Sequence, residues 1–227
     1  LGRIWLETEF RTRNVSCRVI EADEVDDSAV VCAIGTMGAP TVGIEKIPRG
    51  DELENTVRVL ESHIGSSFEA IIIGEIGGAN ALKPLICALQ MDLPVVDGDG
   101  MGRAFPELQM DSFAIGGLDL SPLALGDCHR NQVVLHSVSG PVQAERYARN
   151  LTIEMGGSTA LAMPMMTGHE LKRTLIRKTL SLAKALGEAV LGAREVGKDP
   201  VERIIDLTQG QVLFRGKITD VERRTTR

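Results

Sequence analysis

The sequence has little of what several functional classes require. Of its 227 residues, one is Trp, one is Tyr and five are Phe, so aromatic residues make up only 3% of the chain. A protein that stacks single-stranded bases on aromatic side chains needs more of them. Acidic residues outnumber basic residues by 31 to 25, which gives a formal net charge of −6. Because a nucleic-acid backbone is bound through basic side chains, the composition argues against a nucleic-acid partner.

Long hydrophobic runs and paired cysteines are also lacking. No apolar stretch approaches the ~20 residues that a helix needs to span a bilayer, and the first residues contain no apolar segment typical of a secretion signal. The four cysteines lie far apart and form no CxxC pair, a pattern typical of a reducing compartment. These absences predict a cytoplasmic protein with no membrane partner.

What is present is an alternation of apolar strands and amphipathic helices. Continuous apolar runs at residues 29–34 and 70–73 are typical of strands that are covered on both faces. Apolar residues at helical spacing follow, for example over residues 51–64. Strands that alternate with helices favour right-handed crossovers and parallel pairing. The sequence therefore predicts an α/β fold, a three-layer α/β/α sandwich with a largely parallel sheet.

Several shorter segments have weaker patterns. Residues 80–90 are predicted to form a helix that the Asn80 side chain caps, and residues 171–192 a helix that is broken near Lys178. Four segments are predicted to be short strands: residues 15–20, 41–45, 112–115 and 132–136.

The predicted domain organisation has one main part. Residues 1–210 are expected to form the α/β domain. Residues 211–227 have strand character without a partner hairpin, and the chain then stops. We expect this segment to be the lead strand of a β-rich domain whose remainder is absent.

Ligands of parallel α/β sheets bind outside the carboxyl ends of the strands, where three segments are candidates. In residues 35–40, two glycines at a strand end, Gly35 and Gly38, allow backbone amides to face an anion or a carbonyl oxygen. The alternative, which we favour, is a tight turn before Pro40. Residues 74–80 and 97–107 are the other two.

Glu75 is the notable residue of the second segment. It directly follows a buried strand, where a carboxylate is costly unless it is paired or used. Gly77 and Gly78 follow it, but neither GxxxxGK[ST] nor GxGxxG is present, and a carboxylate repels phosphate. We therefore expect no nucleotide cofactor, and we interpret Glu75 as a general acid/base or a metal ligand.

The third segment gathers charged residues around three glycines. Asp97 and Asp99 flank one glycine, and Arg103 and Glu107 follow. Carboxylates this close bind a divalent metal ion or share acid/base work, and an arginine can hold a carboxylate by two parallel hydrogen bonds. A flexible acidic loop balanced by a local ion pair is the alternative.

This third segment belongs to a longer run, PVVDGDGMGRAFPELQM at residues 94–110, that closely resembles the signature of the S-methyl-thiohydantoin desulfurase-like family. The family was formerly described as a domain of unknown function. The segments MGAPTV at residues 37–42, EIGG at 75–78 and DVERRTT at 220–226 agree with it. The resemblance extends over nearly the whole chain.

The resemblance implies a three-layer α/β domain followed by a β-rich domain, and a hydrolase that releases methanethiol from an S-methylated thiohydantoin or acts on a related cyclic amide. It implies association with hydantoinase or oxoprolinase proteins, and a Gly-rich segment upstream that is missing here. On this hypothesis Asp97 and Asp99 activate the water, directly or through a metal ion. The predicted catalytic residues are Glu75, Asp97 and Asp99, and the predicted substrate-binding residues are Gly38, Gly77, Gly78, Arg103 and Glu107.

Two other functions remain open at this point. An accessory or structural subunit of a hydantoinase/oxoprolinase-type assembly predicts a large exposed apolar patch and no convergent pocket. A binding module for a small acidic metabolite predicts that Arg103 matters and Glu75 does not. A homo-oligomer is expected only because most oligomers are of this kind.

Overall fold

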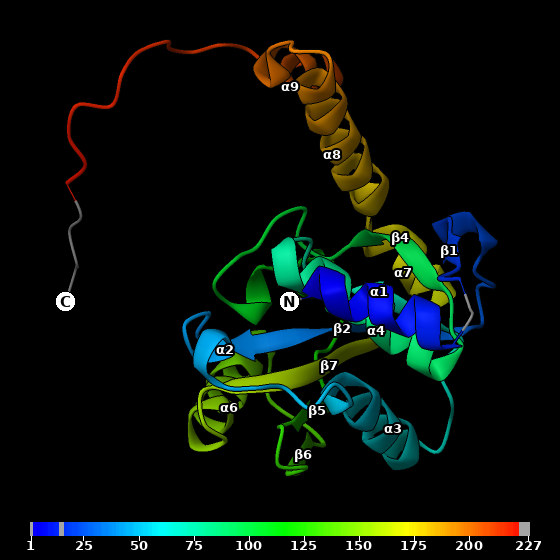
Figure 1. Ribbon diagram of the computed structural model, residues 1–227. Helices are drawn as coiled ribbons and strands as arrows, with labels where there is room; N and C mark the ends of the chain where they lie inside the picture. The colour runs from blue at the N-terminus through cyan, green and yellow to red at the C-terminus, as the bar shows by residue number, and fades with distance from the viewer. Residues whose placement is uncertain (1, 14–15, 223–227) are drawn as a thin grey trace. The chain divides into compact units, whose positions relative to one another are not determined.

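The structure is a computed structural model that describes residues 2–13 and 16–222. The strands of the first part of the chain form one mixed sheet (Figure 1). Contacts divide the chain into two units, Leu1–Leu180 and Ser181–Arg227, and the sheet lies in the first. It has eight strands in the order β1-β4-β3-β2-β7-β5-β6, with β8 paired to β4. The strands are β1 (Val19–Ile20), β2 (Val30–Gly38), β3 (Ala70–Ile73), β4 (Val95–Asp99), β5 (Leu123–Gly126), β6 (Gln132–Leu135), β7 (Ser158–Thr167) and β8 (Ile176–Arg177).

The parallel part of the sheet is the one that the sequence predicts. Strands β1, β4, β3 and β2 pair in parallel, and β7, β5, β6 and β8 extend the sheet by antiparallel pairs. Every residue of β3 is buried, as expected for a strand that helices cover on both faces.

Helices cover both faces, which confirms the three-layer α/β class. On one face lie α3 (Glu52–Ile64) and α4 (Gly78–Met91), and α1 (Gly2–Arg13) packs on α4. On the other lie α6 (Pro141–Glu154) and α7 (Gly168–Thr174), and the short α5 (Ser112–Ile115) packs on α7. Among the described residues, no helix combines the length and the apolarity that crossing a bilayer requires.

Two predicted strands are wrong. Residues 41–45 contain the short helix α2 (Val42–Glu45), and residues 112–115 are helix α5. The Asp111 side chain accepts a hydrogen bond from the amide of Ala114 at 2.6 Å and thereby starts α5. An apolar run of four residues is compatible with a short strand and with a short helix, so local patterns do not distinguish the two.

Other boundaries also differ. Helix α4 begins at Gly78 after a Gly77 cap, so Asn80 lies inside the first turn and does not cap the helix. Of the strand predicted at residues 15–20, β1 keeps two residues, and residue 15 lies outside the described part. The predicted break near Lys178 is confirmed, because Lys178 has a φ of +63° between β8 and α8 (Thr179–Glu195).

The second unit carries most of α8 and the helix α9 (Pro200–Thr208). Asp199 caps α9 by accepting a hydrogen bond from the amide of Val201 at 2.9 Å. Residues 210–222 form neither helix nor strand, so the strand expected after residue 210 does not form in the described part. Residues 223–227, which include the end of the DVERRTT segment, lie outside it.

Candidate functional site

A cavity of about 450 Å³ lies where β2 and β3 end and α4 begins. Thr36 from β2, Glu75 from the β3–α4 loop, Asn80 and Lys83 from α4, and Cys128 from the β5–β6 loop line it. The carboxyl ends of parallel strands are the usual ligand site of open α/β sheets, and the volume suits a small molecule.

Four polar side chains of this cavity form a directed chain of hydrogen bonds, which we call the strand-end network. The Lys83 ammonium donates to Thr36 Oγ1 at 3.4 Å, and this hydroxyl donates to Asn80 Oδ1 at 2.5 Å. The Asn80 amide nitrogen then donates to Glu75 Oε1 at 2.6 Å. The other carboxylate oxygen accepts from the backbone amide of Phe105 at 3.3 Å. Both oxygens of Glu75 are therefore oriented by named donors.

Lys83 is the first donor of the network and lies on the same face of α4 as Asn80, three residues after it. Burial lowers the pKa of the Lys83 ammonium from its usual 10.5, and the carboxylate of Glu52 opposes part of this shift. A lysine with a lowered pKa in a cavity is suited to proton transfer. The cavity thus holds a carboxylate and an ammonium that the strand-end network connects.

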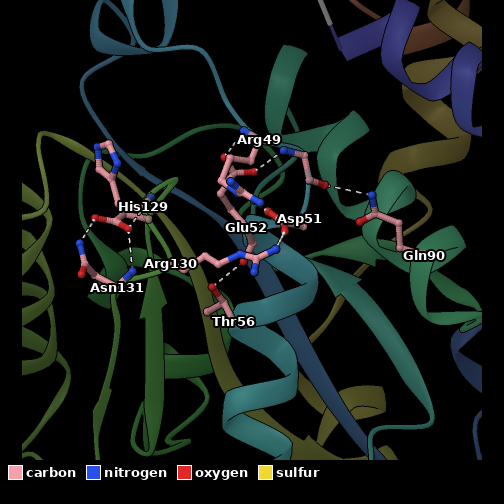
Figure 2. A network of polar contacts seen from close by, with 10 residues as sticks. Arg49, Asp51, Glu52, Thr56, Gln90, His129, Arg130 and Asn131 are labelled. Atoms are coloured by element: carbon pink, nitrogen blue, oxygen red, sulfur yellow. Dashed lines mark hydrogen bonds and ion pairs between the residues drawn. The ribbon is translucent and has the colours of Figure 1, made fainter.

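A second polar network, shown in Figure 2, holds another part of the cavity lining, which includes Gly50, Glu52 and Gln90. The Glu52 carboxylate accepts hydrogen bonds from the backbone amides of Arg49 at 2.6 Å and Gly50 at 2.9 Å. Gln90 of α4 donates to the Gly50 carbonyl at 2.9 Å. Asp51 pairs with the guanidinium of Arg130 at 3.1 Å. These contacts fix the loop before α3 against α4, so this part of the cavity lining is preorganised.

Asp99 has a positioning role instead of facing the cavity. It is fully buried, and its carboxylate accepts hydrogen bonds from the backbone amides of Ile76 at 2.7 Å, Met101 at 3.2 Å and Gly102 at 2.9 Å. Because Ile76 follows Glu75 directly, this carboxylate fixes the loop that carries Glu75.

The glycines around Asp99 are required by packing. A Cβ atom at Gly98 would lie 2.6 Å from the Leu175 side chain, and one at Gly100 would lie 2.5 Å from Phe113 and 2.9 Å from the Gly74 carbonyl. Asp97 is also buried, and its carbonyl accepts a hydrogen bond from the Lys178 amide at 2.9 Å. Neither Asp97 nor Asp99 is among the described residues that line the cavity.

The other predicted residues are divided between two places. Gly38, Gly77 and Gly78, predicted to bind substrate, line the cavity together with Glu75. Gly38 has a φ of +134°, and a Cβ atom there would lie 2.2 Å from the Gly157 carbonyl, so only glycine fits.

Arg103 and Glu107 lie outside this group. The Arg103 guanidinium stacks over the Phe105 ring, 5.4 Å from its centre, and Glu107 accepts a hydrogen bond from the Gln109 side chain. Neither residue lines this cavity.

The residues do not fit the predicted metal ion. Among residues 2–13 and 16–222, no group of three or more His, Cys, Asp and Glu side chains is placed to hold one. Amide hydrogens point at both oxygens of Asp99, whereas a metal ion needs the lone pairs of free carboxylate oxygens. We therefore derive no step through a metal ion.

Thr36 and Lys83 are the residues that sequence reasoning missed as members of the site. For Lys83, the sequence signal is a polar stripe on an otherwise apolar helix: Asn80, Lys83, Cys87 and Gln90 recur at intervals of three or four residues. In the structure all four line the cavity.

Fold and site together define an α/β protein with a cavity at its strand ends. The family described as S-Me-THD-like, N-terminal domain, matches residues 1–137, and S-Me-THD-like, C-terminal domain, matches residues 139–227. The chain belongs to this S-Me-THD-like family, as the sequence resemblance predicts.

A crystal structure of a protein from Chromobacterium violaceum is similar to the chain, with a TM-score of 0.75 and 26% sequence identity. The similarity covers 85% of this chain and 53% of that one, so the chain spans about half the length of that protein. A comparison with curated proteins gives no match. The second family domain begins at residue 139, well before residue 211, where the sequence prediction places the second domain.

Proposed function

We propose that the protein is a hydrolase that releases methanethiol from an S-methylated thiohydantoin, or acts on a related small cyclic amide, in the strand-end cavity. The observation that carries the proposal is the strand-end network, in which the Glu75 carboxylate and the Lys83 ammonium line one cavity. Membership of the S-Me-THD-like family supports the substrate class. A cytoplasmic location, supported by four free cysteines, is part of the same proposal.

The first step is the addition of water. Its oxygen forms a bond to the ring carbon that carries the methylthio group, and the electron pair of the C=N bond moves to the ring nitrogen. Glu75 takes the proton from water, and Lys83 gives a proton to the ring nitrogen. A positioned carboxylate suits the first transfer, because the Asn80 and Phe105 donors hold both of its oxygens.

The second step breaks the C–S bond. The oxygen lone pair of the adduct forms the carbonyl group, and the methylthiolate leaves and takes the proton that Glu75 holds. The hydroxyl proton of the adduct returns to Lys83. Water and substrate are thereby converted into methanethiol and a hydantoin, and both side chains regain their starting state.

The proposal is tested by measuring methanethiol in the gas above the reaction, where the thiols of the protein do not contribute. We expect release by the unmodified protein and a loss of about 10²- to 10⁴-fold in Glu75→Gln, which keeps the shape of the side chain but cannot take a proton. The matched control is Glu188→Gln, since Glu188 is exposed and pairs only along α8 with Lys184 at 3.6 Å.

Two results would contradict the assignment of methanethiol release. One is a folded protein that releases no methanethiol, and the other is a Glu75→Gln variant that keeps the full rate. If a binding module is the true function, the Glu75→Gln variant binds the ring with unchanged affinity and the unmodified protein shows no turnover.

A further inference from the structure

A second cavity, of about 330 Å³, shares a wall with the first. Thr36, Met37, Gly38, Glu75 and Asn80 line both cavities. A ligand whose reacting atom lies beside Glu75 therefore has two spaces open to its other parts. One space is the strand-end cavity assigned to the ring, and the second has no assigned occupant.

The second cavity has a mixed lining, and its apolar part lies on the α6 side of the sheet. Met37, Leu161 and Met163 line it and belong to the apolar cluster that the sheet forms with α6. Leu108 and Phe105 close it from the loop that follows β4. Methionine side chains are flexible and polarisable, so they adapt to apolar groups of different shape.

Its charges disfavour an anion. Three carboxyl groups line the cavity, those of Glu75, Glu107 and Asp111, and Arg149 is the only basic residue among the described residues that line it. The Arg149 guanidinium is already engaged, because Nε donates to Glu145 Oε1 at 2.7 Å and Nη2 donates to the Pro106 carbonyl at 2.8 Å. An acidic substituent would meet an excess of like charge.

We propose that this second cavity binds a neutral, apolar substituent of the ring while the ring itself lies in the strand-end cavity. The inference rests on the proposed function, because the ring must lie beside Glu75. It deepens that function by naming the substrate class: a ring with an aliphatic or thioether side chain, and not an acidic one.

Two glycines offer matched variants that fill one cavity each. Gly35 lines only the second cavity and Gly77 only the first, and a Cβ atom added at either position meets no other atom within 4 Å. Neither residue has a left-handed backbone conformation, so a side chain is tolerated at both. Gly35 lies in β2, where valine is well accommodated.

The experiment measures the binding of three hydantoins, the expected reaction products, by calorimetry. The probes are unsubstituted hydantoin, the derivative with the leucine side chain and the derivative with the aspartate side chain. We expect the leucine derivative to bind at least about tenfold more tightly than unsubstituted hydantoin, since burial of one aliphatic side chain is worth about that factor or more. The aspartate derivative should bind no more tightly than unsubstituted hydantoin.

The variants then locate the preference. In Gly35→Val the advantage of the leucine derivative should fall below about threefold, while unsubstituted hydantoin binds as before. In Gly77→Ala all three affinities should fall by a similar factor, so that the preference persists. Thermal unfolding confirms that each variant is folded. If Gly35→Val does not fold, Gly35→Ala replaces it. In Gly35→Ala, the preference for the leucine derivative over unsubstituted hydantoin should fall at least threefold.

The outcomes separate the two proposals. If no hydantoin binds the folded protein, the proposed function fails and the second cavity loses its assignment with it. If unsubstituted hydantoin binds but the leucine side chain adds nothing, or if its advantage survives in the folded Gly35 variant, only the assignment of the second cavity is overturned.

Discussion

The backbone amide of Ile76 lies 2.7 Å from a carboxylate oxygen of Asp99, and this bond joins the β3–α4 loop to the loop that follows β4. The same carboxylate accepts from the amides of Met101 and Gly102. The amide of Gly100 donates to the Gly74 carbonyl at 3.0 Å, which adds a second link between the loops. The run that resembles the family signature thus acts on the site through the backbone, by holding the loop that carries Glu75.

Replacement of Asp99 by asparagine is expected to damage both stability and activity. Asparagine can keep one oxygen in the place of Oδ2, but its NH₂ then faces the Gly102 amide that now donates to Oδ1, and the charge that strengthens all of these bonds is lost. The free energy of unfolding should therefore fall by about 2 kcal/mol. Because the Glu75 loop loses its anchor, methanethiol release should fall at least tenfold at a temperature where the variant is folded. Urea unfolding and the release assay measure the two effects.

The control for this variant is Asp206→Asn, which makes the same chemical change at an exposed position of α9. Its free energy of unfolding should stay within about 0.5 kcal/mol of the unmodified protein. An Asp99→Asn variant as stable as this control would show that the carboxylate does not hold the two loops together.

The predictable part of the fold is the part that local patterns determine. The continuous apolar run of β3 indicates a buried strand, because a strand covered on both faces needs no polar residues. The antiparallel addition of β7 to β2 was not predictable, since it pairs Val30 with Thr167, far apart in the sequence. Tertiary packing determines which strand pairs with the free edge of β2.

The candidate site shows the same division. Glu75 is predictable because a carboxylate just after a buried strand is costly, and the structure places it in the cavity. Asp99 stands out for the same reason, but whether a buried carboxylate faces a ligand or backbone amides depends on how two loops meet. The polar stripe that contains Lys83 is a local signal, but such a stripe on a helix usually faces water, so the burial of Lys83 was not predictable from it. Its lowered pKa arises only from the packing around α4.

Lys83 is expected to control the alkaline side of the pH profile. Its side chain must be in the ammonium form to give a proton to the ring nitrogen. Burial lowers the pKa of Lys83 below the usual 10.5. The rate of methanethiol release should therefore fall at a pH below 10.5 as Lys83 loses its proton. In Lys83→Met this alkaline decline should disappear and the maximal rate should be about 10²-fold lower.

The rate of methanethiol release is measured from pH 6 to 11 for the unmodified protein, Lys83→Met and Lys184→Met. This series tests whether Lys83 causes the alkaline decline. Lys184 is exposed on α8 and pairs with Glu188, so its replacement should leave the profile unchanged. An alkaline decline that survives in Lys83→Met would assign the proton donor to another group.

Asp111 is expected to make the stability of the protein depend on pH. Its side chain is 3% exposed, and burial raises its pKa from 3.8 to about 6, although the amides of Ala114 and Phe113 partly oppose the shift. The folded protein therefore holds a proton between these two values that the unfolded chain releases. The stabilisation is complete below pH 3.8 and is lost as the pH rises through about 6. A shift of about two units corresponds to about 3 kcal/mol.

The variant Asp111→Asn should remove this dependence while keeping the start of α5, because asparagine caps a helix as well as aspartate does. Urea unfolding at pH 4, 5.5 and 7 measures it. The unmodified protein should lose about 2.4 kcal/mol relative to the variant between pH 4 and 7. Asp206→Asn, at an exposed site, should follow the unmodified protein at every pH. A difference between Asp111→Asn and the unmodified protein that stays constant over this range would mean that folding does not raise the pKa of Asp111. The carboxyl group that lines the second cavity would then carry a full charge even in mild acid, which would strengthen its rejection of acidic ring substituents there.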